Sequence, residues 1–540
     1  MPTNQPPLLA DVNLLSTDAA LLDGIRREGA LTAVPALLEL GQQLGSTEVQ
    51  QLADQANRHA PELKTHDRFG NRIDAIEFHP AWHSLLAMLR KSGMQALPAQ
   101  GSDQAAHVAR AAGFFLHAQI EAGSLCPITM SFAAIPLLRQ EPALFQSLQE
   151  KLYCGQHDPA DRPIAEKSAI LIGMGMTEKQ GGSDLRSNQT TARALTGEGR
   201  GAAYLLNGHK WFFSAPMCDA HLVLARAEGG LSAFFVPRWR FDGSKNTVQI
   251  QRLKDKCGNR SNASAEVEFA DTLGVMIGAE GRGIQTLVEM ANTTRLDCVI
   301  ASSALMRQAL VQGLHHARHR MAFGQLLSEQ PLMQNVLADL ALESEAATLL
   351  MLRLARCFDH AESTLERAWR RIVTPAAKFW ICKRALAFTG ECMEVLGGNG
   401  YVEESPLARL YREAPVNSIW EGSGNVMCLD MLRAIQRDPD GFDLMLAELE
   451  TMANGEPALL SMLVALRHDL AGPTEESERL ARRIAQRLVV FVQGCLMRQH
   501  APAFMAEAFI ASRADAQNGW VFGTLVTGMN SAILERAWPS

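Results

Sequence analysis

The sequence contains little that would indicate a metal site, a disulfide framework or a membrane segment. Its ten cysteines are scattered and form no Cys-x-x-Cys pair, so we expect reduced core thiols and no metal. No run of about 18 apolar residues occurs, and the first residues lack a basic stretch followed by an apolar one. We therefore expect no membrane or targeting segment and a cytoplasmic protein. A net charge of -7 means that any contact with a polyanion must be local.

What the chain does contain is material for several folded domains. It has 540 residues, of which 47% are hydrophobic and 20% charged, as in ordinary globular proteins. The spacing of apolar residues predicts four successive regions: a helical domain at 1–168, a β domain at 169–275, a helical bundle at 276–437 and an additional helical domain at 438–540. The chain shows no internal repeat.

Five motifs stand out along these regions. They are MTEKQGGSD at 176–184, LNGHKWFFS at 206–214, RMAFG at 320–324, LGGNGY at 396–401 and IWEGSGN at 419–425. The pair Asn207-Gly208 predicts a two-residue hairpin turn, after which Trp211, Phe212 and Ser214 would lie on the next strand. The last motif places one carboxylate, Glu421, between a Trp and a Gly-Ser-Gly turn. At this position it can neither cap a helix nor join a salt bridge, so it needs another explanation.

The order and approximate spacing of these motifs resemble those of the acyl-CoA dehydrogenase flavoproteins over about residues 60–435. The resemblance implies an α+β fold with an N-terminal α domain, a middle β-barrel or sandwich and a C-terminal four-helix bundle. It also implies FAD, an acyl-CoA or other small substrate, and a homotetramer built from dimers. GSLCPITM, LKDKCGNRSNAS and the additional C-terminal domain are similar to a branch of this family that serves the bacterial response to DNA alkylation.

By this resemblance, Glu421 is the base that removes the α-proton of the acyl thioester. The position at which some family members carry this base instead is Thr294, so Glu421 has no competitor. The alternative to this catalytic role is that Glu421 is a loop glutamate whose side chain faces water. Arg295 resembles an arginine near the acyl-CoA site, although it could equally be a structural ion-pair partner.

The resemblance assigns the flavin contacts to residues of all five motifs. They are Met176, Thr177, Gly182, Ser183, Trp211, Phe212, Ser214, Arg320, Phe323, Gly397, Gly398, Trp420, Gly422, Ser423 and Asn425. Glycines allow close approach of the backbone, hydroxyls can bond flavin heteroatoms, and aromatic rings can stack on the isoalloxazine or the adenine. Each of three motifs has an alternative interpretation without a flavin. Residues 176–184 could form a solvated hairpin turn, 211–212 could be aromatics of a sheet core, and 320–324 could be a capped turn between helices.

Three departures from the family pattern weaken parts of this assignment. Phe212 stands where a Trp is common, and Glu394 stands where a Gln usually precedes the glycine loop. The Gln after the FG motif is displaced, since Gln330 is followed by Pro331. A carboxylate beside phosphates repels them, so the adenosine contacts are the most affected.

The C-terminal region contains a local basic stripe. Thr474 followed by two glutamates predicts the start of one helix, with Leu480, Ile484, Leu488 and Phe491 on its apolar face. The opposite face carries Arg479, Arg482, Arg483 and Arg487. Residues 441–540 hold 11 acidic and 8 basic residues, so the region as a whole is not basic. A solvated face paired with its own glutamates is the alternative to a DNA contact.

With the family resemblance, the stripe and Arg433 predict sequence-independent contact with the phosphates of double-stranded DNA. We expect this surface to be separated by distance from Glu421. Two hypotheses follow: a DNA-binding protective flavoprotein with a retained, weak dehydrogenase activity, and a metabolic short- or branched-chain acyl-CoA dehydrogenase with no role at DNA.

Overall fold

The computed structural model describes residues 4–101, 104–514 and 521–538, and parts of the predicted domains that fall on other residues lie outside this range. The chain forms two compact units. Residues 1–50, 103–120 and 295–540 make the helical unit, and residues 51–102 and 121–294 make the sheet unit. The unit boundaries differ from the four predicted ranges, and that four-domain division stays a prediction.

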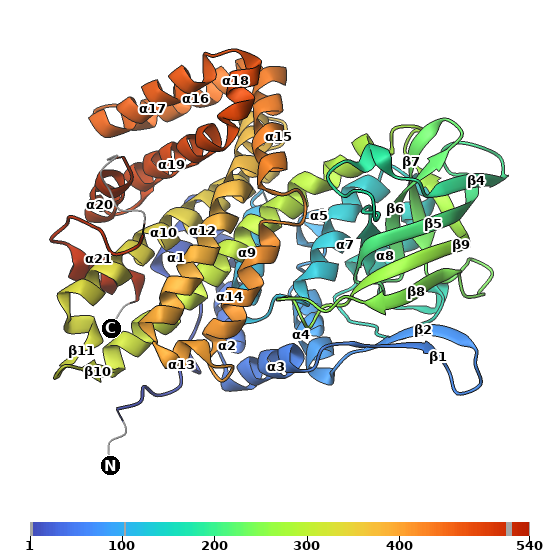
Figure 1. Cartoon of the computed structure of the whole chain (residues 1–540), viewed down its shortest axis with the longest axis horizontal. Helices are drawn as coiled ribbons and strands as arrows, with labels where there is room; N and C mark the ends of the chain where they lie inside the picture. The colour runs from blue at the N-terminus through green and yellow to red at the C-terminus, as the bar shows by residue number, and fades with distance from the viewer. Residues whose placement is uncertain (1–3, 102–103, 515–520, 539–540) are drawn as a thin grey trace. The chain divides into compact units, whose positions relative to one another are not determined.

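The sheet unit combines a few helices with nine strands (Figure 1). Its elements are β1 (Glu62–His66), β2 (Arg72–Glu77), α4 (Pro80–Lys91), α5 (Leu97–Gln100), α7 (Leu125–Leu138), α8 (Pro142–Tyr153), η2 (Ile164–Glu166), β3 (Ile172–Gly175), η3 (Leu185–Ser187), β4 (Thr191–Thr196), β5 (Ala203–Ser214), β6 (Ala220–Ala227), β7 (Gly230–Pro237), β8 (Val248–Leu253) and β9 (Ser264–Ile277). The β1–β2 hairpin lies in a region predicted to be mostly helical.

Seven strands close on themselves, as expected for the middle domain. Their order is β3-β5-β4-β6-β7-β9-β8, and the additional pairings β3–β6 and β5–β9 complete a barrel-like ring. Apolar side chains of these strands form the core, and Leu206, Phe213, Phe234 and Ile250 are fully buried. In β6 and β7 nearly every residue is buried, so these two strands do not show a simple alternation of buried and exposed residues.

The predicted hairpin at Asn207-Gly208 is wrong, because both residues lie inside the 12-residue strand β5. The Asn207 amide donates to Asp271 Oδ1 at 2.8 Å across the β5–β9 pair, where the register shifts. Gly208 has φ of +149°, and a Cβ there would lie 2.6 Å from the Thr190 hydroxyl oxygen. The dipeptide marks a bulge in a long strand rather than a turn.

The helical unit is built around long antiparallel-looking helices (Figure 1). Its elements are α1 (Ala19–Arg27), η1 (Leu31–Ala33), α2 (Val34–Leu44), α6 (Ala106–Ile120), β10 (Met321–Ala322), β11 (Gln325–Leu326), η4 (Leu327–Glu329), α10 (Pro331–Asp359), α11 (Thr364–Ala368), a π-helical turn η5 (Trp369–Val373), α12 (Thr374–Val395), α13 (Gly398–Tyr401), α14 (Pro406–Asn417), α15 (Gly424–Arg437), α16 (Pro439–Ala453), α17 (Pro457–Leu470), α18 (Thr474–Arg479), α19 (Ala481–His500), α20 (Ala503–Ala514) and α21 (Asn530–Ala537). The unit boundaries fall within α3 (Thr47–Arg58) and α9 (Gly283–His319).

The C-terminal helices belong to the same compact unit as the bundle. Helix α19 packs against α10, α12 and α15, as Figure 1 also shows. Buried acids on α10 receive arginines from the end of the chain: Arg513 donates to Asp339 at 2.6 Å and Arg536 lies 2.8 Å from Glu345. A buried carboxylate is tolerated when it is paired and hydrogen-bonded. The region after residue 437 is therefore fixed to the bundle rather than tethered to it.

The basic stripe lies on two helices, where the sequence predicted one. Pro473 precedes the first turn without a side-chain hydrogen bond, α18 ends at Arg479, and α19 begins at Ala481. The predicted apolar face is confirmed in α19, where Ile484, Leu488 and Phe491 are buried. Within the described ranges, no helix has the length and apolarity that crossing a membrane requires.

Candidate active site

Glu421 lies on a tight loop between α14 and α15 whose backbone is left-handed at two successive residues. Glu421 has φ of +58° and Gly422 has φ of +107°. A Cβ at position 422 would lie 2.4 Å from the methyl carbon of Met427, the end of a flexible side chain, so it is mainly the positive φ that favours glycine there. A non-glycine residue with positive φ costs about 1–3 kcal/mol and is held in place by its surroundings.

Two buried cations hold this loop by its carbonyl oxygens. Arg295 Nε donates to the Glu421 carbonyl at 3.1 Å, and Lys378 Nζ donates to the Gly422 carbonyl at 2.7 Å. Trp420 is fixed as well, because its indole N–H donates to Asn417 Oδ1 at 3.1 Å. The half-buried Glu421 side chain thus projects from a backbone that is fixed on both sides.

Arg295 owes its position to a carboxylate that it shares with Arg371. Arg295 Nη1 lies 2.7 Å from Asp430 Oδ2, and Arg371 donates to both Asp430 oxygens at 2.8 and 2.9 Å. Burial acts to raise the pKa of Asp430, but the hydrogen bond from Arg371 and the charge of Arg295 lower it below its ordinary value. Arg295 therefore acts on the backbone of Glu421 in this structure. Nothing in the sequence pattern indicated Asp430, Arg371 or Lys378.

In the sheet unit, the loop that follows β3 is shaped by a fully buried ion pair. Glu178 and Lys210 lie 2.7 Å apart and both side chains are 0% exposed. Glu178 also accepts the backbone N–H of Gln189 at 2.7 Å. Burial acts to raise the pKa of Glu178, but the Lys210 charge and these hydrogen bonds lower it to about 2. The pair fixes the predicted MTEKQGGSD loop to β5, and nothing in the sequence pattern identified it.

This loop is held by internal hydrogen bonds and leaves part of its backbone exposed. Thr177 accepts the Trp211 N–H through its carbonyl at 2.8 Å, and Met176 accepts from the Asn188 amide, also at 2.8 Å. A Cβ at Gly182 would lie 3.0 Å from the Thr177 methyl carbon, so a side chain would fill the space beside the Thr177 hydroxyl. Gly182 and Ser183 are exposed. The hydroxyls and open backbone fit a flavin.

The aromatic residues of β5 divide between core and surface. Phe213 is buried and stacks on His221 with ring centroids 4.1 Å apart, whereas Phe212 is 51% exposed. Lys254 Nζ lies 3.5 Å from the centroid of Trp211 and 4.7 Å from that of Phe212. Ser214 pairs with Met174 across the β3–β5 ladder. Trp211 and Phe212 therefore form a surface wall rather than part of the barrel core.

The residues predicted for the adenosine half of FAD lie at the β10–β11 turn and at α13 of the helical unit. Phe323 is fully exposed at 101% and has φ of +55°. A Cβ at Gly397 or Gly398 would meet no atom of the described residues within 4 Å, so this loop is open. Arg320 Nη1 donates to the Asn4 carbonyl at 2.5 Å. Glu394 is exposed near the same loop.

The stripe arginines have different partners. Arg483 and Arg487 both bind Asp469, Arg483 at 3.0 Å, and Arg479 lies 3.2 Å from Glu476. Arg482 Nε instead donates to Asn425 Oδ1 at 2.8 Å. The expected separation by distance is therefore wrong for Arg482, since Asn425 follows Glu421 by four residues in the first turn of α15. Arg433 is exposed.

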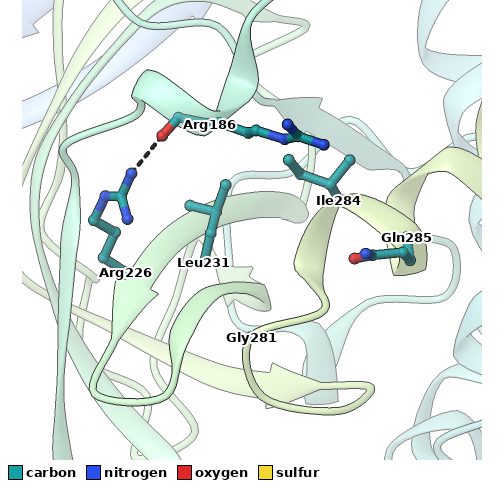
Figure 2. Close-up of a pocket in the computed structure, with 6 residues that line it drawn as sticks. All are labelled: Arg186, Arg226, Leu231, Gly281, Ile284 and Gln285. Atoms are coloured by element: carbon teal, nitrogen blue, oxygen red, sulfur yellow. Dashed lines mark hydrogen bonds between the residues drawn. The ribbon is translucent and has the colours of Figure 1, made fainter.

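A cavity of about 190 Å³ lies in the sheet unit, and none of the predicted site residues is among those described as lining it. Its lining residues are Arg186, Arg226, Leu231, Gly281, Ile284 and Gln285. Figure 2 shows Arg226 turned toward the Arg186 carbonyl, with which it forms a hydrogen bond. Arg226 also donates to the Asn188 carbonyl at 2.6 Å, so its guanidinium supports the loop that follows η3.

Comparison with known families matches most of the chain. The adaptive response protein AidB N-terminal domain matches residues 4–159, the acyl-CoA dehydrogenase middle domain matches residues 173–272, and the acyl-CoA dehydrogenase C-terminal domain matches residues 281–436. The putative acyl-CoA dehydrogenase AidB of Escherichia coli (strain K12) is 48% identical over 519 residues, which are 96% of this chain and 94% of AidB.

Two solved structures are similar over nearly the whole chain. Caenorhabditis elegans ACDH-11 in complex with C11-CoA has a TM-score of 0.85 at 25% identity and covers 99% of this chain and 93% of its own. The apo form of Bd2924 has a TM-score of 0.83 at 29% identity, with coverage of 92% and 99%. Both similarities extend beyond the region that the five motifs span.

Proposed function

Because the chain belongs to the acyl-CoA dehydrogenase family of FAD-dependent oxidoreductases, in its AidB branch, we propose that it oxidises an acyl thioester or related small substrate with Glu421 as the base. The observation that carries this proposal is the Glu421 loop, which two buried cations hold in a left-handed conformation. Such a backbone is found where a side chain must be aimed.

In the proposed reaction, the Glu421 carboxylate accepts the α-proton of the thioester and becomes a neutral acid. The electron pair of that C–H bond forms the new Cα=Cβ bond as a hydride leaves Cβ, for which bound FAD would supply the two-electron acceptor. Arg295 and Lys378 keep the carboxylate at a fixed place by holding the two carbonyls around it. A positioned general base contributes about 10² to 10⁴ to the rate.

We propose that the flavin is held by the residues that the sequence assigned to it. Thr177, Ser183, Trp211, Phe212 and Ser214 of the sheet unit supply hydroxyls and an aromatic wall. From the helical unit, Trp420, Ser423 and Asn425 flank Glu421. Arg320 and the exposed Phe323 ring would contact the adenosine half of FAD in another copy, which supports a homotetramer built from dimers.

We propose further that the C-terminal helices contact the phosphates of duplex DNA in a response to alkylation, in the cytoplasm. The likeness to AidB and the exposed arginines Arg433, Arg479, Arg482 and Arg483 support this role. A second candidate, a metabolic short- or branched-chain acyl-CoA dehydrogenase with no role at DNA, is favoured by Asp469, which offsets the charge of Arg483 and Arg487.

One pair of measurements on the purified holoprotein tests both parts. Anaerobic mixing with isovaleryl-CoA should bleach the flavin absorbance if Glu421 has a thioester within reach. Titration of duplex DNA at several salt concentrations should give binding that is independent of sequence and a log–log slope of roughly -0.9 for each phosphate contacted. Bleaching without salt-dependent DNA binding would favour the metabolic candidate, and DNA binding without bleaching would contradict the dehydrogenase activity.

A further inference from the structure

The segment Asn4–Pro7 lies against the two motifs that the sequence assigned to the adenosine half of FAD. The Asn4 side chain pairs with the backbone of Met321 in both directions, since its amide donates to the Met321 carbonyl and its oxygen accepts the Met321 N–H, each at 2.9 Å. This is the hydrogen-bond pattern of an added strand residue at the edge of β10. Asn4 has φ of +48°, a conformation that asparagine tolerates better than most residues.

The same segment reaches two further elements. Gln5 Oε1 accepts from the Asn399 amide at 3.1 Å, and the Pro7 carbonyl accepts from His315 Nε2 at 2.8 Å. Asn399 lies in the glycine loop at α13, and His315 lies one turn before the end of α9. Four consecutive residues thus connect the end of α9 and the β10–β11 turn that follows it with α13, which is distant from both in the sequence.

The hydrogen bond between Arg320 and the Asn4 carbonyl indicates which ligand this segment could help to bind. Arg320 Nη1 donates to the backbone carbonyl of Asn4 at 2.5 Å, a neutral partner that does not compensate the positive charge. A guanidinium has five N–H donors in a planar fork, so as far as the described residues are concerned Arg320 keeps donors for an anion. The carbonyl therefore orients the fork without neutralising it, in contrast to the carboxylate that holds Arg295.

We propose that the segment Asn4–Pro7 is a brace that presents Arg320 and Asn399 together to the pyrophosphate of a dinucleotide. This proposal rests on the proposed FAD function and adds to it: the preference of the protein for FAD over FMN depends on a segment outside the five motifs. FMN contains the flavin ring and one phosphate but lacks the adenosine half that Arg320 and Phe323 would contact. The brace therefore acts on FAD binding and leaves FMN binding unchanged.

The test compares the two flavins on protein from which the flavin has been removed. The double variant Asn4→Ala/Gln5→Ala removes the Met321 pairing and the Asn399 contact. Leu8→Ala is the matched control, because Leu8 belongs to the same stretch and is 74% exposed. Affinities for FAD and for FMN are measured by quenching of flavin fluorescence, and amide hydrogen exchange is followed with each flavin at Asn4 and Gln5, the two residues of the segment that carry a backbone N–H.

We expect the double variant to bind FAD about 3- to 10-fold more weakly, the loss typical of a pair of exposed hydrogen bonds, with FMN unchanged. Leu8→Ala should keep the FAD-to-FMN ratio of the parent. In the parent, FAD but not FMN should slow amide exchange at Asn4 and Gln5.

The brace is overturned if the double variant keeps the FAD-to-FMN affinity ratio of the parent. It is also overturned if the double variant binds FAD more tightly, because the segment would then compete with FAD. Faster amide exchange at Asn4 and Gln5 in the presence of FAD also overturns the brace. A parent protein that takes up neither flavin would overturn the proposed function itself, and with it the brace, and this failure is seen before any variant is made.

Discussion

The loop of Glu421 and the stripe on α18 and α19 both depend on cations, but the cations have different partners. In the loop, Arg295 and Lys378 each donate to a main-chain carbonyl, Arg295 while also paired with Asp430, and their side chains are buried. In the stripe, Arg483 and Arg487 donate to the Asp469 carboxylate while their side chains are 54% and 31% exposed. A cation on a carbonyl fixes the backbone, whereas a cation on a carboxylate loses part of its charge.

The difference indicates what each region can do. A buried carbonyl that loses its donor leaves an unsatisfied polar group, so the loop is sensitive to single substitutions. The Asp469 carboxylate is 4% exposed, so an arginine that turned from it to a phosphate would leave a buried charge with one partner fewer. The loop is thus held at its backbone, whereas two arginines of the stripe are held at a buried carboxylate. The following variants test this contrast.

The largest effect is expected for Glu421→Gln, since the amide has nearly the same shape but cannot accept a proton. Reduction of the flavin by an acyl-CoA should slow by about 10² to 10⁴, with FAD content and melting temperature unchanged. Anaerobic stopped-flow absorbance measures the rate. Reduction as fast as in the parent would show that Glu421 is not the base, and the loop would lose its assigned purpose.

Lys378→Met should have the next largest effect, because it leaves the Gly422 carbonyl without its donor. We expect a loss of about 1–3 kcal/mol in the free energy of unfolding and roughly tenfold slower flavin reduction. The exposed Lys383 on the same helix provides the matched control, Lys383→Met, which should change neither quantity. Equal behaviour of the two variants in denaturant unfolding and stopped-flow reduction would contradict the view that a buried cation fixes the loop.

Asp469→Asn tests the stripe by an expected gain of DNA affinity rather than a loss of activity. Removing this carboxylate releases the charge of Arg483 and Arg487, so affinity for duplex DNA should rise by roughly 3- to 10-fold, with a steeper salt dependence. Fluorescence anisotropy at several salt concentrations measures both. Flavin reduction should stay as in the parent. If affinity and slope do not change, these two arginines do not contact phosphate.

Arg482→Ala sharpens the comparison, because Arg482 belongs to the stripe by sequence and to the Glu421 loop by contact. Loss of its bond to Asn425 should slow flavin reduction by about threefold, consistent with one exposed hydrogen bond. Arg483→Ala, one residue away, should leave that rate unaltered. The same effect from both substitutions would mean that the Asn425 contact has no influence on the loop.

The smallest effect is expected for Arg433→Ala on the exposed face of α15. Removing one phosphate contact should lower DNA affinity by about twofold at moderate salt and reduce the log–log slope by about 0.9, equally for unrelated duplexes. Loss that depends on the DNA sequence would instead indicate base contact, and no loss would place Arg433 outside the interface.

Part of the candidate site could be predicted because it depends on residues near one another in the chain. The stretch from Trp420 to Asn425 and the loop from Met176 to Ser183 were assigned through the family resemblance, whose motifs are each local in the sequence. The Glu178–Lys210 pair and the partners Lys378 and Asp430 were missed, because these contacts join residues 32, 44 and 135 positions apart. Local pattern contains no information on such pairings.

The sequence by itself determined the order of helical and β regions, the apolar strands of the barrel and the loop types that need glycine, because these follow from side-chain periodicity and backbone sterics. Only the tertiary structure decided that Asn207-Gly208 is a bulge, that the stripe arginines divide between Asp469 and Asn425, and that Asn4 reaches Arg320. Those outcomes depend on which distant groups compete for the same hydrogen bonds. That competition is settled only when the chain is folded.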